Sequence, residues 1–166
     1  MLYFDYFKFC VFFGMSCWIF LIFLNNLKDK STNFNILHNM FTMREIKNDK
    51  NTSQALTKRS INSESFAKKT LVFVTLYQFI TSIFMIISAL FYLLTILINY
   101  EYATLAIQFM NFSLVLFVAM WIFFICGGLY FGYWIKTPQY QQMHFNLLKV
   151  SILIFLLINY NTGGMS

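Results

Sequence analysis

Four long runs of apolar residues, separated by polar stretches, dominate the hydropathy pattern of this chain. The runs cover residues 9–27, 71–98, 107–133 and 145–160, and Phe145 and Tyr160 form the two ends of the last run. A hydrocarbon core of ~30 Å requires about 20 apolar residues in a helix, and the runs lack the period-two alternation of a transmembrane barrel. Because backbone groups in hydrocarbon must be satisfied internally, the pattern predicts an all-α, polytopic membrane protein. We expect four transmembrane helices in a single membrane domain over residues 1–166.

Residues 28–69 form the one long polar segment, which the pattern places as a loop between the first and second spans. Within it, residues 33–43 carry apolar side chains at positions 34, 36, 37, 40, 41 and 43. That spacing is typical of a short amphipathic helix on a membrane surface. The remainder is rich in Lys, Asn, Ser and Thr and lacks a core of its own. We therefore expect this loop to become ordered only against a neighbour.

Composition supports the membrane class and adds an inference about origin. The chain is 59% hydrophobic and 11% charged, whereas a soluble domain carries about 25% charged residues. It contains 22 Phe but only 6 Gly and 1 Pro. Phe, Lys, Asn, Ile and Tyr have AT-rich codons, whereas helix propensity alone would favour Ala over Phe. The usage therefore indicates an AT-rich genome, such as a mitochondrial genome or that of a reduced bacterium.

The basic residues gather on one side of the predicted topology. Residues 28–69 hold nine of the twelve Lys and Arg residues, and two more are Lys136 and Lys149. With four spans, both termini lie on the opposite side from this basic segment. The positive-inside rule then places the segment in the mitochondrial matrix or cytoplasm and the termini in the intermembrane space or periplasm. A basic segment between two spans is not a nucleic-acid domain, so we expect no nucleic-acid partner.

Two groups of residues are candidates for helix packing. Gln78, Thr81 and Ser82 share one face of the second span, where they are placed to form interhelical hydrogen bonds. The second group lies at the end of the third span and consists of Gly127, Gly128 and Gly132. Because Gly128 and Gly132 are four residues apart, they share a helix face that another helix could approach closely. The simpler alternative is that these glycines are tolerated without a packing role.

Neither catalytic residues nor a metal or haem site is evident in the sequence. Axial haem ligands at membrane depth would be His or Met, but His38 lies in the polar loop and His144 at a helix entrance. The three cysteines lie in apolar stretches without Cys-x-x-Cys spacing and are interpreted as inert buried thiols. The predicted spans carry no charged residue at clear mid-membrane depth, which argues against ion translocation. We therefore expect a non-enzyme without a protein-bound cofactor.

Lipid contacts are a separate expectation. Four basic residues before and at the start of the second span could bind an anionic phospholipid such as cardiolipin: Lys58, Arg59, Lys68 and Lys69. A solvated cluster on the positive side of the membrane explains the same residues equally well. Tyr133 and Trp134, beyond the third span, suit the headgroup layer.

A series of short motifs extends along most of the chain: Asn25-Asn26-Leu27-x-Asp29, HNMFTM at 38–43, YQFIT at 77–81, GGLYFGYW at 127–134 and Tyr140-x-Gln142. In this order and spacing, residues 15–158 resemble the bacterial family of predicted small integral membrane proteins, a domain of unknown function. The resemblance implies a four-helix membrane domain. The family pattern usually has Glu at the positions of Gln78 and Leu129, which implies that this chain retains the packing and has lost a charge-dependent role. The residue usage is similar to that of ciliate mitochondrial membrane proteins, so the chain is identified as a divergent, mitochondrially encoded member.

These observations lead to a functional expectation by association. We expect a non-catalytic accessory subunit of a mitochondrial respiratory-chain complex, with cytochrome c oxidase (complex IV) ahead of complex I. Its partners would be other membrane subunits of that complex and lipids, in the mitochondrial inner membrane. The alternatives are a bacterial inner membrane as the location and an independent small transporter or ion-conducting protein as the function.

Overall fold

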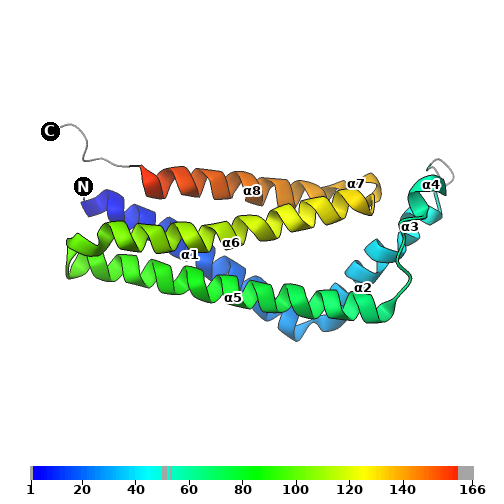
Figure 1. Cartoon of the computed structure of the whole chain (residues 1–166), viewed down its shortest axis with the longest axis horizontal. Coiled ribbons are helices and arrows are strands. Elements are labelled where there is room, and N and C mark those ends of the chain that lie inside the picture. Colours follow the sequence, from blue (N-terminus) through cyan, green and yellow to red (C-terminus); the bar gives the residue numbers. More distant parts are fainter. Residues whose placement is uncertain (1, 50–51, 53, 161–166) are drawn as a thin grey trace.

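The computed structural model describes residues 2–49, 52 and 54–160, and it consists of helices joined by short connections (Figure 1). Four helices have the length and hydropathy to cross a membrane, counting the short 3₁₀ helix that precedes the third: α1 (Leu2–Lys28), α5 (Glu64–Leu97), α6 (Ala103–Tyr130) and α8 (Pro138–Asn159). The remaining elements are short: α2 (Lys30–Thr42), α3 (Arg44–Lys47), α4 (Gln54–Thr57), the 3₁₀ helix η1 (Tyr100–Tyr102) and α7 (Tyr133–Lys136). The predicted all-α fold with four membrane-spanning helices is confirmed.

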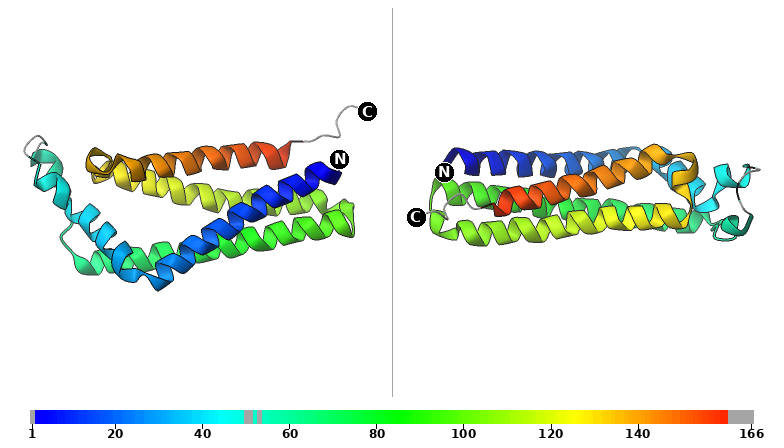
Figure 2. Two further views of the ribbon diagram at one scale, coloured as in Figure 1. Left: turned by 180° about the vertical axis from the view of Figure 1, so that it is seen from behind. Right: turned by 90° about the horizontal axis from the view of Figure 1, so that it is seen from above.

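The long helices pack in chain order, with α1 against α5, α5 against α6, and α6 against α8 (Figure 2). The start of α1, the end of α8 and η1 lie at one end of the molecule, which we name the terminal end (Figure 1). The helices α2, α3, α4 and α7 lie at the other end, which we name the basic end (Figure 1). The start of α1 and the end of α8 therefore lie at the opposite end of the bundle from the basic segment, as an even number of spans requires.

Apolar side chains occupy both the interior and the outside of the bundle. The main core cluster contains buried residues from all four long helices, among them Phe12, Met85, Phe117 and Ile154. Many large apolar side chains on the same helices face outward, as Val72 does with 67% of its surface exposed. Such a surface is unfavourable in water and suited to lipid hydrocarbon. The distribution therefore agrees with four helices embedded in a bilayer.

Local capping sets where the helices begin. The Asp29 carboxylate accepts a hydrogen bond of 3.0 Å from the Thr32 N–H at the start of α2, and this bond holds the pKa of Asp29 below its usual value. The Ser63 hydroxyl accepts from the Phe66 N–H in the same way, so α5 begins at Glu64 rather than at residue 71. Pro138 occupies the first turn of α8, which therefore starts before the predicted residue 145.

The loop expected over residues 28–69 is largely helical where the structure describes it, which corrects the prediction. The amphipathic stretch 33–43 lies within α2, and α2 packs along α5. A second core cluster joins this segment to the long helices through five buried residues: Phe41, Met43, Ile46, Ala67 and Phe131. Three of these residues come from the segment before α5, and Phe131 follows α6. The described part of the segment therefore folds as helices against the long helices of the same chain, rather than as a loop without a core.

Gly132 provides a test of how the basic end is built. Its φ of 63° lies in the left-handed region, directly after α6 ends at Tyr130. A Cβ atom at this position would lie 3.0 Å from Ile46 Cδ1 and 3.1 Å from Leu56 Cδ2. Gly132→Ala should therefore lower the free energy of unfolding by about 1–2 kcal/mol, because a side chain is strained in this conformation. Unfolding in detergent micelles measures the change.

Gly127→Ala is the matched control for this substitution. A Cβ atom on Gly127 would meet nothing within 4 Å, and this residue lies inside α6. The control should leave stability unchanged or raise it slightly, because Ala has the higher helix propensity. Equal losses for the two variants would contradict the role assigned to Gly132.

Candidate functional site

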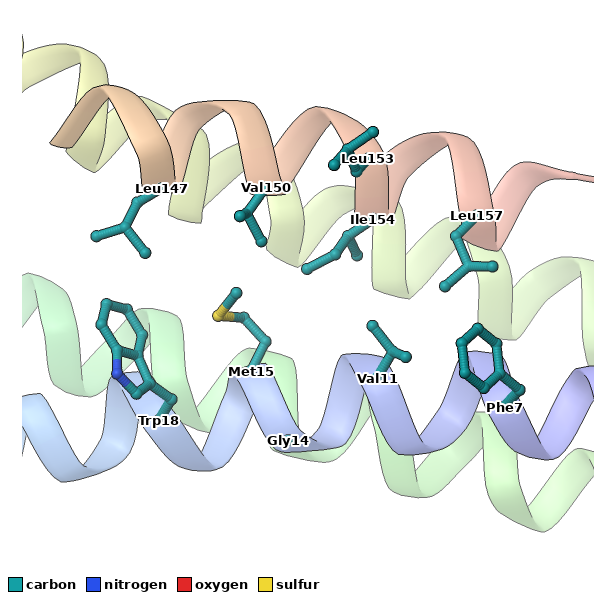
Figure 3. A pocket seen from close by; sticks show the side chains of 10 residues that line it. All are labelled: Phe7, Val11, Gly14, Met15, Trp18, Leu147, Val150, Leu153, Ile154 and Leu157. Atoms are coloured by element: carbon teal, nitrogen blue, oxygen red, sulfur yellow. The ribbon is translucent and has the colours of Figure 1, made fainter. Parts of the chain in front are cut away.

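An apolar groove runs between α1 and α8, two long helices that share few contacts (Figure 3). Its volume is about 600 Å³. The α1 wall consists of Phe7, Val11, Gly14, Met15 and Trp18, and the α8 wall consists of Leu147, Val150, Leu153, Ile154 and Leu157. Figure 3 shows the two rows of side chains facing each other across the gap. The lining offers no acid, base or nucleophile, so it suits hydrocarbon or an apolar helix.

Gly14 gives one wall of this groove a gap. A Cβ atom on Gly14 would meet no atom of the described chain within 4 Å. The backbone of α1 is therefore open to an outside partner at this point. A missing side chain at such a position is what allows two membrane helices to approach closely.

A cluster of polar groups lies at the terminal end of the bundle, and three of its side chains, Asp5, Lys8 and Tyr92, are buried. Asp5 is only 4% exposed, and its two carboxylate oxygens accept hydrogen bonds from Tyr92 Oη at 2.8 Å and Tyr100 Oη at 3.2 Å. Lys8, one turn later and 5% exposed, donates from Nζ to the Tyr160 carbonyl at 2.8 Å. We name these five residues the Asp5 cluster. It connects the start of α1 with the ends of α5 and α8.

The hydropathy pattern starts the first span at residue 9, which leaves Asp5 and Lys8 before it. The structure corrects this, because α1 begins at Leu2 and includes both residues. Opposite charges at i and i+3 share a helix face, and that spacing was the available signal. The expectation concerned mid-membrane depth, whereas Asp5 and Lys8 lie near the terminal end, where hydroxyl groups from Tyr92 and Tyr100 accommodate the carboxylate.

The predicted polar face of α5 is buried, but only one of its three residues bonds to another helix. Gln78 Oε1 accepts a hydrogen bond from Asn26 Nδ2 of α1. Ser82 Oγ instead donates to the Phe79 carbonyl of its own helix at 2.8 Å, and Thr81 Oγ1 is buried without a partner among the described residues. Asn26 and Gln78 belong to two of the motifs that carry the family resemblance. A Glu in place of Gln78 would accept the same hydrogen bond.

The three glycines prove to have three different environments, which corrects the expectation of a shared packing face. Gly127 adjoins open space, and Gly132 lies beyond the end of α6 in a left-handed turn. Of the three, Gly128 is the one that meets another long helix, because a Cβ atom there would clash with Gln141 Oε1 of α8. Gln141 also donates from Nε2 to the Ile125 carbonyl at 3.2 Å. The contact thus forms between α6 and a side chain of α8, and the sequence reading missed Gln141.

His144 is also placed differently from expectation. It lies inside α8, where it stacks on Trp121 of α6 with ring centroids 5.6 Å apart and packs at a tilt against Phe124 with ring centroids 5.2 Å apart. His38 lies on α2 and stacks on Phe34 at 5.5 Å. Each histidine therefore has an aromatic packing partner. Among residues 2–49, 52 and 54–160, no group of three or more His, Cys, Asp or Glu side chains could hold a metal.

The four basic residues proposed for lipid contact divide into two kinds. Arg59 donates to the Tyr130 carbonyl at 3.3 Å and lies over the Tyr130 ring. Lys68 pairs with Glu64 at 3.5 Å and lies over the Phe34 ring. Lys58 and Lys69 are exposed. Arg59 and Lys68 thus have partners within the chain, and the lipid contact remains a prediction.

Four membrane-spanning helices joined by buried polar contacts define a small polytopic integral membrane protein. Residues 4–161 match the model of the family described as predicted small integral membrane protein (DUF2165). The chain belongs to this family, which confirms the resemblance carried by the short motifs. No curated protein and no solved structure matches the chain.

The Asp5 cluster leads to a test by a double-mutant cycle. Asp5→Leu should lower the free energy of unfolding by roughly 1–3 kcal/mol, because it leaves the buried Tyr92 hydroxyl without its acceptor. Tyr92→Phe removes the donor, so the double variant should lose less than the two single variants together. Reversible unfolding in micelles provides the three values. Strict additivity would show that the hydrogen bond between Asp5 and Tyr92 does not contribute to stability.

Proposed function

We propose that this protein is a non-catalytic structural subunit that binds a transmembrane helix of a partner protein in the α1–α8 groove. The groove carries the proposal. The long helices pack in chain order, and the packing leaves the facing sides of α1 and α8 largely without a protein neighbour. Tight packing is the main source of helix association in lipid, where the hydrophobic effect no longer drives helices together.

The dimensions of the groove fit a helix segment. From Phe7 to Trp18 the α1 wall extends about 16 Å at ~1.5 Å per residue, which is about half the thickness of a hydrocarbon core. A lipid acyl chain could also cover an apolar surface of this length. Gly14 favours a helix, because its uncovered backbone permits close contact between helices, whereas a flexible chain needs no such gap.

The host assembly we propose is a respiratory-chain complex of the mitochondrial inner membrane, with cytochrome c oxidase ahead of complex I. The AT-rich residue usage supports a mitochondrial genome, and proteins encoded there commonly serve in respiratory complexes. The basic segment would face the matrix and the termini the intermembrane space, in agreement with the positive-inside rule.

Gly14→Leu tests the groove directly. The new side chain would fill space outside the described chain, so folding should be retained while the partner helix is excluded. Recovery of the chain in its native assembly should fall at least about tenfold, because a clash at a helix interface readily costs ~1.4 kcal/mol or more. Gly127→Leu is the control, since it also meets no neighbour within 4 Å but lies outside the groove. Equal recovery of the two variants would rule out a partner helix at Gly14.

The host complex is tested separately by native gel electrophoresis of solubilised membranes. The chain should co-migrate with a band that contains haem a, which identifies cytochrome c oxidase by its absorbance. Co-migration with complex I instead would identify complex I as the host, and the proposed structural role would still hold. Finding the chain outside every respiratory complex would refute this assignment.

A second candidate function is a small transporter or ion-conducting protein, and one observation favours it. Asp5 and Lys8 are ionisable groups buried inside a membrane-spanning helix, and such groups often mark a path for ions or protons. The two candidates differ in what the isolated chain can do. Ion or proton flux through vesicles that contain the chain alone, abolished in Asp5→Asn, would support transport; a structural subunit produces no such flux.

A further inference from the structure

A second, smaller pocket opens at the basic end, outside the α1–α8 groove. Its volume is about 200 Å³, and it lies between α2 and α3 on one side and α7 and the start of α8 on the other. Its apolar residues include Met43, Ile46 and Phe131, each of which is less than 9% exposed. Tyr133 and Tyr140, whose rings stack at 5.5 Å, line another side. The pocket therefore has both an apolar and an aromatic wall.

One acid and one base also line this pocket. Glu45 at the start of α3 is exposed, and Lys136 at the end of α7 keeps 38% of its side chain exposed. Lys136 also forms an ion pair with Asp49, which lies outside the lining. Amide and hydroxyl groups complete the polar part of the lining: Asn39, Thr137 and Gln139. A ligand with both a positive and a negative group can therefore find partners for each.

We propose that this pocket binds the ethanolamine phosphate headgroup of a membrane phospholipid. Glu45 would accept hydrogen bonds from the ammonium group, and Lys136 would bind the phosphate. Burial raises the pKa of Tyr133 to about 12, so its phenol stays protonated at neutral pH and can donate to a phosphate oxygen. The α6 helix ends at Tyr130 and α8 begins at Pro138, which places the pocket where the spans leave the hydrocarbon.

Hydrogen bonding and charge decide between headgroups. At ~30 Å³ for each water, 200 Å³ corresponds to roughly seven water molecules, which suffices for ethanolamine phosphate. The primary ammonium of ethanolamine also donates hydrogen bonds to a carboxylate, which a quaternary ammonium cannot. The lining holds one acid, Glu45, and one base, Lys136, and Asp49 already pairs with that base, so the lining offers no surplus positive charge to the anionic headgroups of cardiolipin and phosphatidylglycerol. The ligand inferred here therefore differs from the anionic lipid considered for Lys58, Arg59, Lys68 and Lys69.

Native mass spectrometry of the detergent-solubilised full chain tests this assignment. The chain would be equilibrated with dioleoyl phosphatidylethanolamine, phosphatidylcholine or phosphatidylglycerol. We expect phosphatidylethanolamine to be retained preferentially, and Glu45→Gln to weaken its binding roughly tenfold through loss of a charge-assisted hydrogen bond. Retention of phosphatidylglycerol should stay equal or increase in the same variant. Because Glu45 is exposed and outside the core, this variant should fold normally.

Glu64→Gln is the matched control, because Glu64 is an exposed acid at the same end of the molecule and outside the pocket. It should leave the lipid preference unchanged. Equal retention of the three lipids, or equal effects of Glu45→Gln and Glu64→Gln, would overturn the assignment. Free phosphoethanolamine has the same headgroup as the lipid but lacks the acyl chains. If it bound as tightly as the lipid, the pocket would belong to a soluble ligand and the lipid assignment would be refuted.

Discussion

Two polar contacts, one near each end, hold α1 against α5. Near the terminal end, Tyr92 donates a hydrogen bond to Asp5, and toward the basic end Asn26 donates to Gln78. At membrane depth no water is present to replace either partner, so breaking such a contact leaves polar atoms in hydrocarbon. The apolar contacts between the two helices are less directional and tolerate sliding. The two hydrogen bonds therefore fix the register of α1, and the position of its outer face depends on them.

The same principle joins α6 to α8 and leaves the remaining side of the bundle open. The Asn111 and Asn159 amides bond to each other at 2.9 Å near the terminal end, and Gln141 bonds to the Ile125 carbonyl toward the basic end. Because each outer helix is bound mainly to its inner neighbour, α1 and α8 need not touch along their length. The groove between them follows from this pairwise attachment, and it is the surface that a partner helix could complete.

Apolar packing, rather than buried hydrogen bonds, stabilises the basic end. Its short helices are stabilised because Phe41, Met43 and Ile46 pack against Phe131, just after the end of α6. The left-handed turn at Gly132 directs α7 toward this cluster. Ion pairs and cation–π contacts in this region are largely exposed and contribute little individually. The pocket between α3 and α7 thus depends on apolar packing, and its charged rim remains available to a ligand.

Sequence alone determined the four spans, the common side of the two termini, the burial of Gln78 and the family, because these depend on composition and on spacing within single helices. It also indicated that residues 33–43 form an amphipathic helix. Sequence alone did not predict that Asp5 lies inside the first helix. An acid at the edge of an apolar run is acceptable there only if hydroxyl groups reach it. The hydroxyl groups come from Tyr92 and Tyr100, which lie far along the chain. The tertiary structure also decided two further features: the contact of Gln141 with Gly128, and the groove between α1 and α8. Both depend on how helices that are remote in sequence pack against each other.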